Sequence, residues 1–428
     1  MKKRLRVITL GCSKNTVDTE HLLAQLPADD FVVVEDASQV DYLLLNTCGF
    51  IGDAKEESIE AILEAVECKK RGEAAEVIVF GCLSQRYADE LPEEIPEVDA
   101  WFGARDLSPV LKYLGVTPGA FTSRRISERK GYAYLKISEG CDRRCSYCAI
   151  PFIRGAHKSV PMEDLVQEAR SLAAEGVKEL ILIAQDTTYY GLDLYHRRAL
   201  AELIERLSAI EEIEWIRIHY SYPAAFPEDV LDQMANNPKV CKYLDIPLQH
   251  ISDKVLDNMH RNVDGAWTRA LIEKLRQRVP GVALRTTMIV GHPGEGEEEF
   301  RELVDFIKAA RFERMGAFRY SEEEGTYGAE RLCDDVSDED KQSRYDELMS
   351  VQRDISLAYN TSRVGSELKV MVDEVMGDSL VCRSEYESPE VDGEIMVKNT
   401  EGDVRPGDFI KVRIVAAEDY DLIAERII

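Results

Sequence analysis

The stretch from Gly140 to Pro151, GCDRRCSYCAIP, decides how the chain is organised. It places Cys141, Cys145 and Cys148 in a C-x3-C-x2-C run, directly after the strand-like segment 132–137. Three thiols in one short loop indicate a metal site, because thiolate is the soft ligand of zinc and of iron-sulfur clusters. Structural zinc usually needs a fourth ligand from a second Cys pair or a His pair, and neither follows nearby. A four-iron cluster is favoured; zinc and unliganded cysteines are the alternatives.

The spacing of this loop resembles that of the radical S-adenosylmethionine enzymes. The resemblance implies a [4Fe-4S] cluster with one open iron, which binds the amino and carboxylate groups of S-adenosylmethionine. One electron from the cluster would then cleave this cofactor to a 5'-deoxyadenosyl radical.

Length and composition indicate a water-soluble protein of several domains. The chain has 428 residues, enough for roughly three domains of about 150 residues. Hydrophobic residues make up 45% and charged residues 31%, as in ordinary globular proteins. No run approaches the roughly 18 apolar residues of a membrane span. The start, Met1 to Cys12, faintly imitates a lipoprotein signal, but its apolar part is too short, and we predict a first strand.

Charge and cysteine usage limit the possible compartments and partners. Ten scattered cysteines fit a reducing cytosol better than a disulfide scaffold, so we expect a cytoplasmic protein. The net charge of −27 opposes binding to a polyanion and favours a basic partner.

The first third of the chain repeats one pattern, in which an apolar strand ends in a cysteine. The predicted strands 5–10, 42–45 and 77–80 lead to Cys12, Cys48 and Cys82. Such apolar runs are typical of buried parallel strands, whose carboxyl ends share one edge of a sheet. We therefore expect the three cysteines to meet and to bind a second metal cluster. The alternative is that they are small core residues.

Two further predictions concern this region. The helix expected over 54–70 should bury one face, formed by Ile59, Ile62, Leu63 and Val66. Four cysteines lack partners at ligand spacing and are interpreted as structural: Cys68, Cys241, Cys333 and Cys382.

A linker is predicted around 118–130, and six strand-helix units follow it. The strands are expected at 132–138, 179–185, 215–220, 241–247, 283–290 and 314–320. Helices are expected at 161–174, 199–210, 227–235, 266–278 and 295–310. Six such units are two short of the closed eightfold barrel, so the pattern predicts an open (β/α)6 partial TIM barrel. Its carboxyl edge should carry the polar clusters 185–188, 219–222, 249–250 and 291–294.

The end of the chain changes to a β pattern after a long charged helix predicted over 337–359. Strands are expected at 368–372, 379–382, 394–397 and 409–415, separated by turn residues. This predicts a small antiparallel, OB-like β-barrel. The overall fold class is therefore α/β, with an N-terminal βαβ domain, a central partial barrel and a C-terminal small β-barrel.

The three segments together resemble the methylthiotransferase family of radical S-adenosylmethionine enzymes over essentially the whole chain. The resemblance implies an N-terminal domain with an auxiliary cluster at 1–120, a radical domain at 127–358 and a TRAM domain at 361–428. It also implies two [4Fe-4S] clusters, the auxiliary one on Cys12, Cys48 and Cys82. S-adenosylmethionine would be both the radical source and the methyl donor, and separate sulfur and low-potential electron donors would be partners.

The family has one branch that modifies an adenosine of transfer RNA and one that modifies an aspartate of ribosomal protein twelve of the small subunit. The segments Ala184 to Asp193, AQDTTYYGLD, and Gly140 to Cys145 resemble the aspartate branch. The resemblance implies methylthiolation of the β-carbon of that aspartate. Residues 362–428 carry eight Lys and Arg against sixteen Asp and Glu, which suits a basic protein better than RNA.

Candidate contacts to S-adenosylmethionine follow from the same resemblance. They are Tyr147 in the cysteine loop, Gln185 after the second strand of the barrel, and Gly291 and Pro293 in the MIVGHPG segment. Ordinary packing, loop capping or a plain strand-to-helix turn would also explain these residues. Other polar residues have possible roles: Asp186 in cofactor or substrate contact or in loop capping, His250 and His292 in proton handling or structure, and Arg154 in carboxylate binding or on the surface.

Two alternative functions remain at this point. The first keeps the chemistry and changes the substrate to a transfer-RNA adenosine. The second is an RNA-binding factor with iron-sulfur or zinc sites and no catalysis, which would need no open iron.

Overall fold

The structure is a computed structural model that describes residues 1–35, 39–126, 131–398 and 403–427. It divides into two compact units. The first unit contains residues 1–127, 138–143 and 148–168, and the second contains 128–137, 144–147 and 169–428. The cysteine loop therefore contributes residues to both units.

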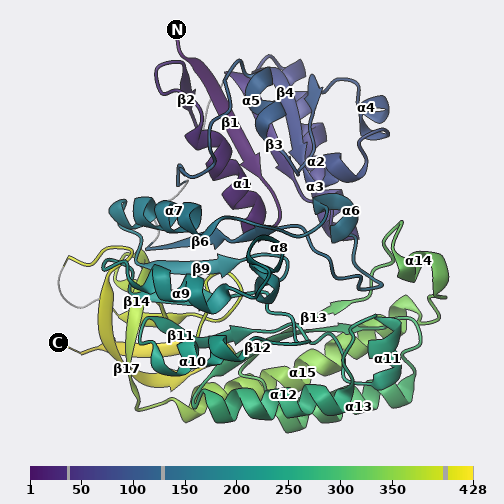
Figure 1. Ribbon diagram of the computed structural model, residues 1–428, viewed down its shortest axis with the longest axis vertical. Helices are drawn as coiled ribbons and strands as arrows, with labels where there is room; N and C mark the ends of the chain where they lie inside the picture. Colours follow the sequence, from purple (N-terminus) through teal and green to yellow (C-terminus); the bar gives the residue numbers. More distant parts are fainter. Residues whose placement is uncertain (36–38, 127–130, 399–402, 428) are drawn as a thin grey trace. The chain divides into compact units, whose positions relative to one another are not determined.

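The first unit is built on a five-stranded parallel sheet with the strand order β2-β1-β3-β4-β5 (Figure 1). The strands are β1 (Lys3–Thr9), β2 (Phe31–Val33), β3 (Val40–Thr47), β4 (Ala74–Gly81) and β5 (Ala100–Trp101). The helices are α1 (Ser13–Ala24), α2 (Gly52–Lys70), α3 (Cys82–Arg86), α4 (Leu91–Glu94) and α5 (Ser108–Tyr113). The three predicted apolar strands are thus the neighbours β1, β3 and β4.

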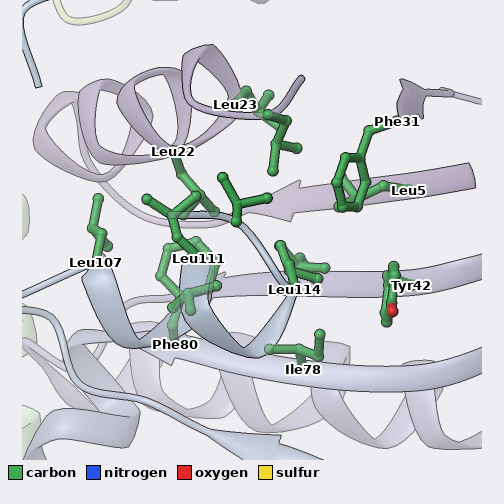
Figure 2. Packing of buried hydrophobic residues seen from close by; sticks show 14 residues of the cluster. Leu5, Leu22, Leu23, Phe31, Tyr42, Ile78, Phe80, Leu107, Leu111 and Leu114 are labelled. Carbon is green, nitrogen blue, oxygen red and sulfur yellow. The ribbon is translucent and has the colours of Figure 1, made fainter. Parts of the chain in front are cut away.

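The sheet has a hydrophobic core on each face, because side chains alternate along a strand. Figure 2 shows Ile78 and Phe80 packed with Leu22 and Leu111 on one face. Val77 and Val79 of the same strand belong to the opposite core. The continuous apolar runs in the sequence therefore correspond to strands that are covered on both sides.

The prediction for α2 is only half right. Ile62 and Val66 are buried against the sheet, but Ile59 is 37% exposed and Leu63 49% exposed. The helix presents a narrower apolar stripe to the sheet than the four residues would make, and two of them lie on its solvent side.

The second unit contains six parallel strands in the order β13-β12-β11-β10-β9-β6, which confirms the open partial barrel. The strands are β6 (Tyr132–Lys136), β9 (Glu179–Ile183), β10 (Trp215–Ile218), β11 (Val240–Asp245), β12 (Ala283–Val290) and β13 (Arg314–Arg319). The predicted helices appear as α7 (Met162–Ala174), α9 (Leu200–Ser208), α10 (Glu228–Asn236), α12 (Gly265–Arg278), α13 (Glu297–Ala310) and α15 (Asp338–Ser362). In the described residues, the edge strands β6 and β13 do not pair.

Several short elements connect these strands. They are the hairpin of β7 (Ser138–Glu139) and β8 (Lys158–Ser159), α6 (Ile150–Arg154), the 3-10 turn η1 (Thr187–Tyr189), α8 (Leu192–Tyr195), α11 (Asp253–Asn258) and α14 (Tyr327–Arg331). The predicted linker has no helix or strand over 118–126, and residues 127–130 lie outside the described part. Arg124 within it is buried and pairs with Glu20 and Glu168.

The last five strands close into the predicted small barrel in the order β14-β15-β16-β18-β17. They are β14 (Glu367–Met376), β15 (Ser379–Ser384), β16 (Ile395–Lys398), β17 (Phe409–Ala417) and β18 (Leu422–Arg426). The sequence did not predict β18. All pairs are antiparallel except β16 with β18, which run parallel.

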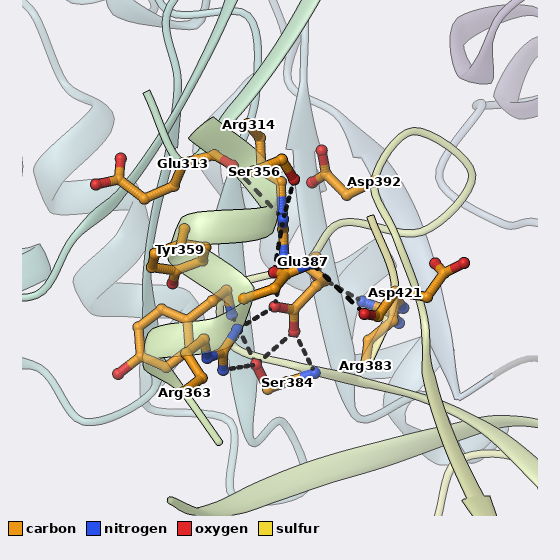
Figure 3. Close-up of polar contacts among 12 residues, drawn as sticks. Glu313, Arg314, Ser356, Tyr359, Arg363, Arg383, Ser384, Glu387, Asp392 and Asp421 are labelled. Carbon is orange, nitrogen blue, oxygen red and sulfur yellow. Dashed lines mark hydrogen bonds and ion pairs between the residues drawn. The ribbon is translucent and has the colours of Figure 1, made fainter. Parts of the chain in front are cut away.

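Buried ion pairs join this closed barrel to the six-stranded sheet. Glu179 at the start of β9 accepts from Arg217 Nε at 2.7 Å and from Arg383 Nη2 of β15 at 2.9 Å. Figure 3 shows a second cluster, in which Glu387 contacts Arg314 of β13 at 3.1 Å and also Arg363 and Ser384. The two parts of the second unit are therefore held together by charges removed from water.

We predict that Glu387→Gln destabilises this unit in a pH-dependent way. Burial alone raises the pKa of Glu387, but the Arg363 and Arg314 charges and the Ser384 hydrogen bond outweigh it and hold the pKa at about 2. Because this is below the unfolded value, the stabilisation is present above about pH 4.5 and is lost as the pH falls toward 2. At pH 7 the substitution should lower the free energy of unfolding by roughly 3–5 kcal/mol, since it leaves buried arginines unpaired.

Urea unfolding followed by circular dichroism at several pH values would measure this effect. The control is Glu367→Gln, which removes an exposed pair with Arg413 and should cost at most about 1 kcal/mol. Equal unfolding midpoints for the two variants at pH 7 would contradict the prediction.

Candidate cluster and cofactor site

The first cysteine triad lies at one edge of the parallel sheet. Cys12 caps the N-terminus of α1 after β1, Cys48 follows β3, and Cys82 begins α3 after β4. Because β1, β3 and β4 are adjacent and parallel, their carboxyl ends bring the three cysteines together. This is the arrangement that the sequence pattern predicts.

A glycine allows the first two strand ends to approach. Gly11 has a φ of +86°, and a Cβ atom on it would lie 2.6 Å from Cys48 Cβ and 2.9 Å from its Sγ. A side chain at this position would therefore collide with Cys48, and the backbone angle favours glycine as well.

Two polar side chains hold these strand ends in place. Asn15 Nδ2 donates to Leu10 O at 2.8 Å and to Thr47 O at 3.2 Å, so it joins the loops that follow β1 and β3. Ser58 Oγ of α2 accepts from the Cys48 backbone N–H at 3.0 Å and donates to its carbonyl at 2.8 Å. The backbone N–H and carbonyl of Cys48 are thus both hydrogen-bonded.

The surroundings of Cys48 and Cys82 disfavour free thiolates, whereas Cys12 is exposed. Burial raises the pKa of Cys48, and burial raises the pKa of Cys82 to about 11, with the neighbouring cysteines contributing repulsion. Arg154 acts in the opposite direction on both groups. Three adjacent thiolates would need a bound cation for charge balance, and binding it would release protons.

The donor set of this triad bears on the kind of metal group. Three cysteine thiolates are soft ligands of the kind that iron-sulfur clusters select.

The start and end of the second cysteine loop are closed by a hairpin in the first unit. Ser138 pairs with Ser159 in the β7–β8 ladder, and the Cys141 backbone N–H donates to Gly155 O at 3.0 Å. Gly140 has a φ of +76°, and a Cβ atom there would lie 2.1 Å from Ala156 O. The loop that holds Cys141, Cys145 and Cys148 is thereby pinched at its base.

The middle of the loop contacts the partial barrel within the second unit. The Ser146 backbone N–H donates to Met259 O at 3.1 Å, and Ser146 O accepts from the Gly328 N–H at 2.7 Å. Arg261 Nη1 donates to Cys145 Sγ at 3.5 Å and to the Tyr147 hydroxyl at 3.3 Å. A buried arginine therefore lies beside one proposed ligand of this triad.

Comparison with known proteins agrees with this geometry. Family models match residues 4–103 (uncharacterized protein family UPF0004), 135–307 (radical SAM superfamily) and 364–427 (TRAM domain). Ribosomal protein uS12 methylthiotransferase RimO of Phocaeicola vulgatus is 51% identical over 430 residues, covering 99% of each chain. The protein of the same name from Bacteroides thetaiotaomicron is 50% identical, covering 99% of this chain and 98% of its own. The chain belongs to the RimO family of ribosomal protein uS12 methylthiotransferases.

A solved structure shares the fold. The radical S-adenosylmethionine methyltransferase TsrM from Kitasatospora setae, solved with cobalamin and a [4Fe-4S] cluster, matches with a TM-score of 0.55 and 17% identity. The match covers 74% of this RimO-family chain and 75% of that chain.

The two histidines have structural positions in this RimO-family fold. His292 is fully buried, with Nε2 3.3 Å from Ser146 Oγ and Nδ1 3.2 Å from Pro293 O. Burial lowers the pKa of His292 to about 4, so it is neutral at neutral pH. His250 Nε2 lies 3.2 Å from Glu295. The alternative of a hydrogen-bonded structural role fits both.

The predicted cofactor contacts lie in the second unit. Tyr147 packs with the hydrophobic cluster of Met259 and Tyr320. Gly291 has a φ of +74°, and a Cβ atom on it would lie 2.3 Å from Lys341 Cγ of α15, which explains this glycine by close packing. Pro293 O accepts from Asn258 at 3.0 Å.

The Gln185-Asp186 pair follows β9 at the carboxyl edge of the sheet. Asp186 Oδ1 accepts from the Thr188 N–H at 3.0 Å and from its hydroxyl at 2.6 Å. Asp186 therefore caps the turn η1, which is the loop-capping alternative. Gln185 is half-buried beside it.

Gln249 belongs to the predicted polar cluster 249–250, but sequence reasoning assigned it no individual role. The backbone of Gln249 has a φ of +74° and forms an isolated parallel β-bridge with Met288. Its side-chain Oε1 atom is buried and has no hydrogen-bond partner among the described residues. It can therefore accept a hydrogen bond from a ligand. The positive φ at a non-glycine residue leaves no mark in the sequence.

We predict that Cys48→Ala removes one of two clusters. Iron and acid-labile sulfide per chain in the reconstituted protein should fall to about half, since each triad would hold one cluster. The matched control is Cys68→Ala on α2 of the same unit, where Cys68 is half-exposed beside Arg71. Its iron content should be unchanged, and an equal loss in both variants would remove Cys48 from the ligand set.

Proposed function

We propose that this chain methylthiolates the β-carbon of an aspartate in ribosomal protein uS12, with S-adenosylmethionine as radical source and methyl donor. The observation that carries the proposal is the presence of both cysteine triads in a chain 51% identical to a RimO protein over its full length. A domain match alone would leave the substrate open, whereas the full-length match includes all three segments.

The metal ligands and cofactor contacts are part of this proposal. Cys12, Cys48 and Cys82 would bind an auxiliary [4Fe-4S] cluster, and Cys141, Cys145 and Cys148 the radical-forming one. When bound and reduced, the cluster at the second triad would supply the electron for cleavage of S-adenosylmethionine. Tyr147, Gln185, Gly291 and Pro293, from the loop and the carboxyl edge of the sheet, would contact this cofactor.

The residues around the second triad would prepare the site for this chemistry. Ser146 and His292 hold the loop against the end of β12, and Arg261 places a fixed positive charge beside Cys145. Since Arg261 also donates to Pro247 O at 2.6 Å, its guanidinium cannot swing away. The three cysteines of this loop are half-buried, and Ser146 between them is buried.

The chain would have three functional domains. Residues 1–120 would bind the auxiliary cluster, residues 127–358 would form the radical, and residues 361–428 would form the TRAM domain. Two arginines of the last segment, Arg363 and Arg383, are buried, and so are two acidic side chains, those of Glu387 and Asp392. These buried charges cancel, so the acidic excess of the segment remains on its exposed residues. The remaining acidic surplus suits a basic ribosomal protein and disfavours RNA.

The proposal includes three further requirements. A low-potential electron donor must reduce the second cluster, a sulfur donor must supply the inserted atom, and the protein would act in the cytoplasm where its substrate is made. In the described part of the chain, every helix is too short or too polar to cross a lipid bilayer.

An anaerobic turnover assay on the reconstituted protein tests this function. S-adenosylmethionine and a low-potential reductant are supplied, uS12 and transfer RNA are offered in parallel, and both are analysed by mass spectrometry. We expect a methylthio mass increment on one aspartate of uS12, together with 5'-deoxyadenosine. Modification of an adenosine instead would show that the substrate is transfer RNA. A lack of 5'-deoxyadenosine would exclude radical chemistry.

Two variants sharpen the assay. Cys145→Ala should abolish 5'-deoxyadenosine formation, because the second triad loses a ligand. Cys333→Ala, at an exposed cysteine outside both triads, should leave the yield unchanged. Equal yields from both variants would contradict the assignment of Cys145.

A further inference from the structure

Arg154 is a buried cation whose surroundings the proposed reaction does not explain. It ends the short helix α6, six residues after Cys148, and only 4% of its surface is exposed. Burying a charge is costly unless it is paired and hydrogen-bonded. The partners of Arg154 therefore indicate what the side chain is for.

Four side chains in the first unit hold the guanidinium. Nη1 contacts Asp18 Oδ2 at 2.7 Å and Glu139 Oε2 at 3.1 Å, and Nη2 donates to Asn15 Oδ1 at 2.6 Å. Nε donates to Cys82 Sγ at 3.2 Å. Because the guanidinium is planar and rigid, the first three contacts aim the Nε–H bond at the sulfur atom.

These partners come from both cysteine motifs. Asn15 and Asp18 lie on α1, whose N-terminus is Cys12, and Cys82 is itself a member of the first triad. Glu139 directly precedes the Gly140–Cys141 pair, and Arg154 follows the end of the same loop. One side chain thus ties the first triad to both ends of the second cysteine loop.

A second buried arginine in this unit, Arg124, also pairs with two carboxylates. Arg124 contacts the carboxylates of Glu20 and Glu168. Arg154 satisfies its charge with two carboxylates in the same manner and in addition donates to a thiol that the charge balance does not require. The contact to Cys82 is therefore the feature that needs a separate explanation.

Hydrogen bonds to cluster sulfur and nearby positive charge shift the potential of an iron-sulfur cluster. Both stabilise the form that carries one more electron, and their effect is strong where water is excluded. An N–H donor at 3.2 Å from a ligand sulfur in a buried site meets both conditions.

We propose that Arg154 is a positioning residue that raises the reduction potential of the cluster bound by Cys12, Cys48 and Cys82. This inference rests on the proposed function, in which these three cysteines are ligands. Asp18 acts in the opposite direction, because it adds negative charge beside the same guanidinium.

The test is a redox titration of the full chain monitored by electron paramagnetic resonance. The background is Cys141→Ala/Cys145→Ala/Cys148→Ala, so that only the N-terminal cluster gives a signal. Arg154→Met should lower the reduced-to-oxidised ratio at the background midpoint at least tenfold, which is about 59 mV for a one-electron couple. The midpoint potential of Arg154→Lys should lie between those of the background protein and Arg154→Met, since lysine keeps the positive charge without the planar guanidinium.

Two further variants separate tuning from general damage. Asp18→Asn should move the midpoint in the positive direction, because it removes a negative charge while Arg154 stays. Arg124→Met, which breaks a buried ion pair elsewhere in the unit, should leave the midpoint unchanged. Opposite shifts at positions 154 and 18 are not expected from misfolding.

The outcomes distinguish this inference from the proposed function. If the background protein binds no cluster, the ligand assignment of the first triad fails. If it binds one and the midpoint is unchanged in Arg154→Met, or moves equally in Arg124→Met, the role of Arg154 is overturned. If Arg154→Met binds no cluster, the other two variants test the role of Arg154. A positive midpoint shift in Asp18→Asn with a negative shift in Arg154→Lys supports the role, and any other pair of signs overturns it.

Discussion

Thiolates removed from water require positive charge nearby, and this requirement governs the first unit. Cys48 and Cys82 follow the ends of buried strands, where burial raises their pKa values. As metal ligands they are thiolates, and a nearby cation must balance their negative charge. Parallel strand ends supply the convergence, Gly11 supplies the space, and Arg154 supplies part of the charge. The same principle recurs in the second unit, where Arg261 lies beside Cys145. In each triad an arginine thus donates to a cysteine sulfur atom: Arg154 to Cys82 and Arg261 to Cys145.

Elements whose patterns are local could be predicted from the sequence. The runs ending in Cys12, Cys48 and Cys82 are apolar throughout, which is the signature of strands buried on both faces, and their shared edge followed from parallel pairing. The six strands of the partial barrel were placed for the same reason. Strand β18 was missed because residues 422–426 form a short alternating segment at the very end of the chain. Its parallel pairing with β16 depends on closure of the barrel, which no local pattern specifies.

Residues whose roles depend on distant partners could not be predicted. Arg154 and Arg261 are ordinary charged residues in the sequence, and only tertiary contacts show that they are buried against cysteines. The positive φ of Gln249 is equally invisible. The exposed flank of α2, with Ile59 and Leu63, illustrates the converse error, because helical periodicity predicts an apolar face without saying how wide the supporting sheet is. Sequence patterns therefore locate ligands better than the groups that adjust them.

The ion pairs between the closed barrel and the six-stranded sheet have a consequence for how such chains can diverge. Arg314 on the sheet depends on Glu387 of the tail, and Arg383 of the tail depends on Glu179 of the sheet. If the tail were exchanged for an unrelated substrate-recognition domain, Arg314 and Glu179 on the sheet would remain buried without their partners in the tail. New specificity in this architecture must therefore arise by substitutions on the outer surface of the existing barrel, while its inner carboxylates and arginines are inherited together with the catalytic body.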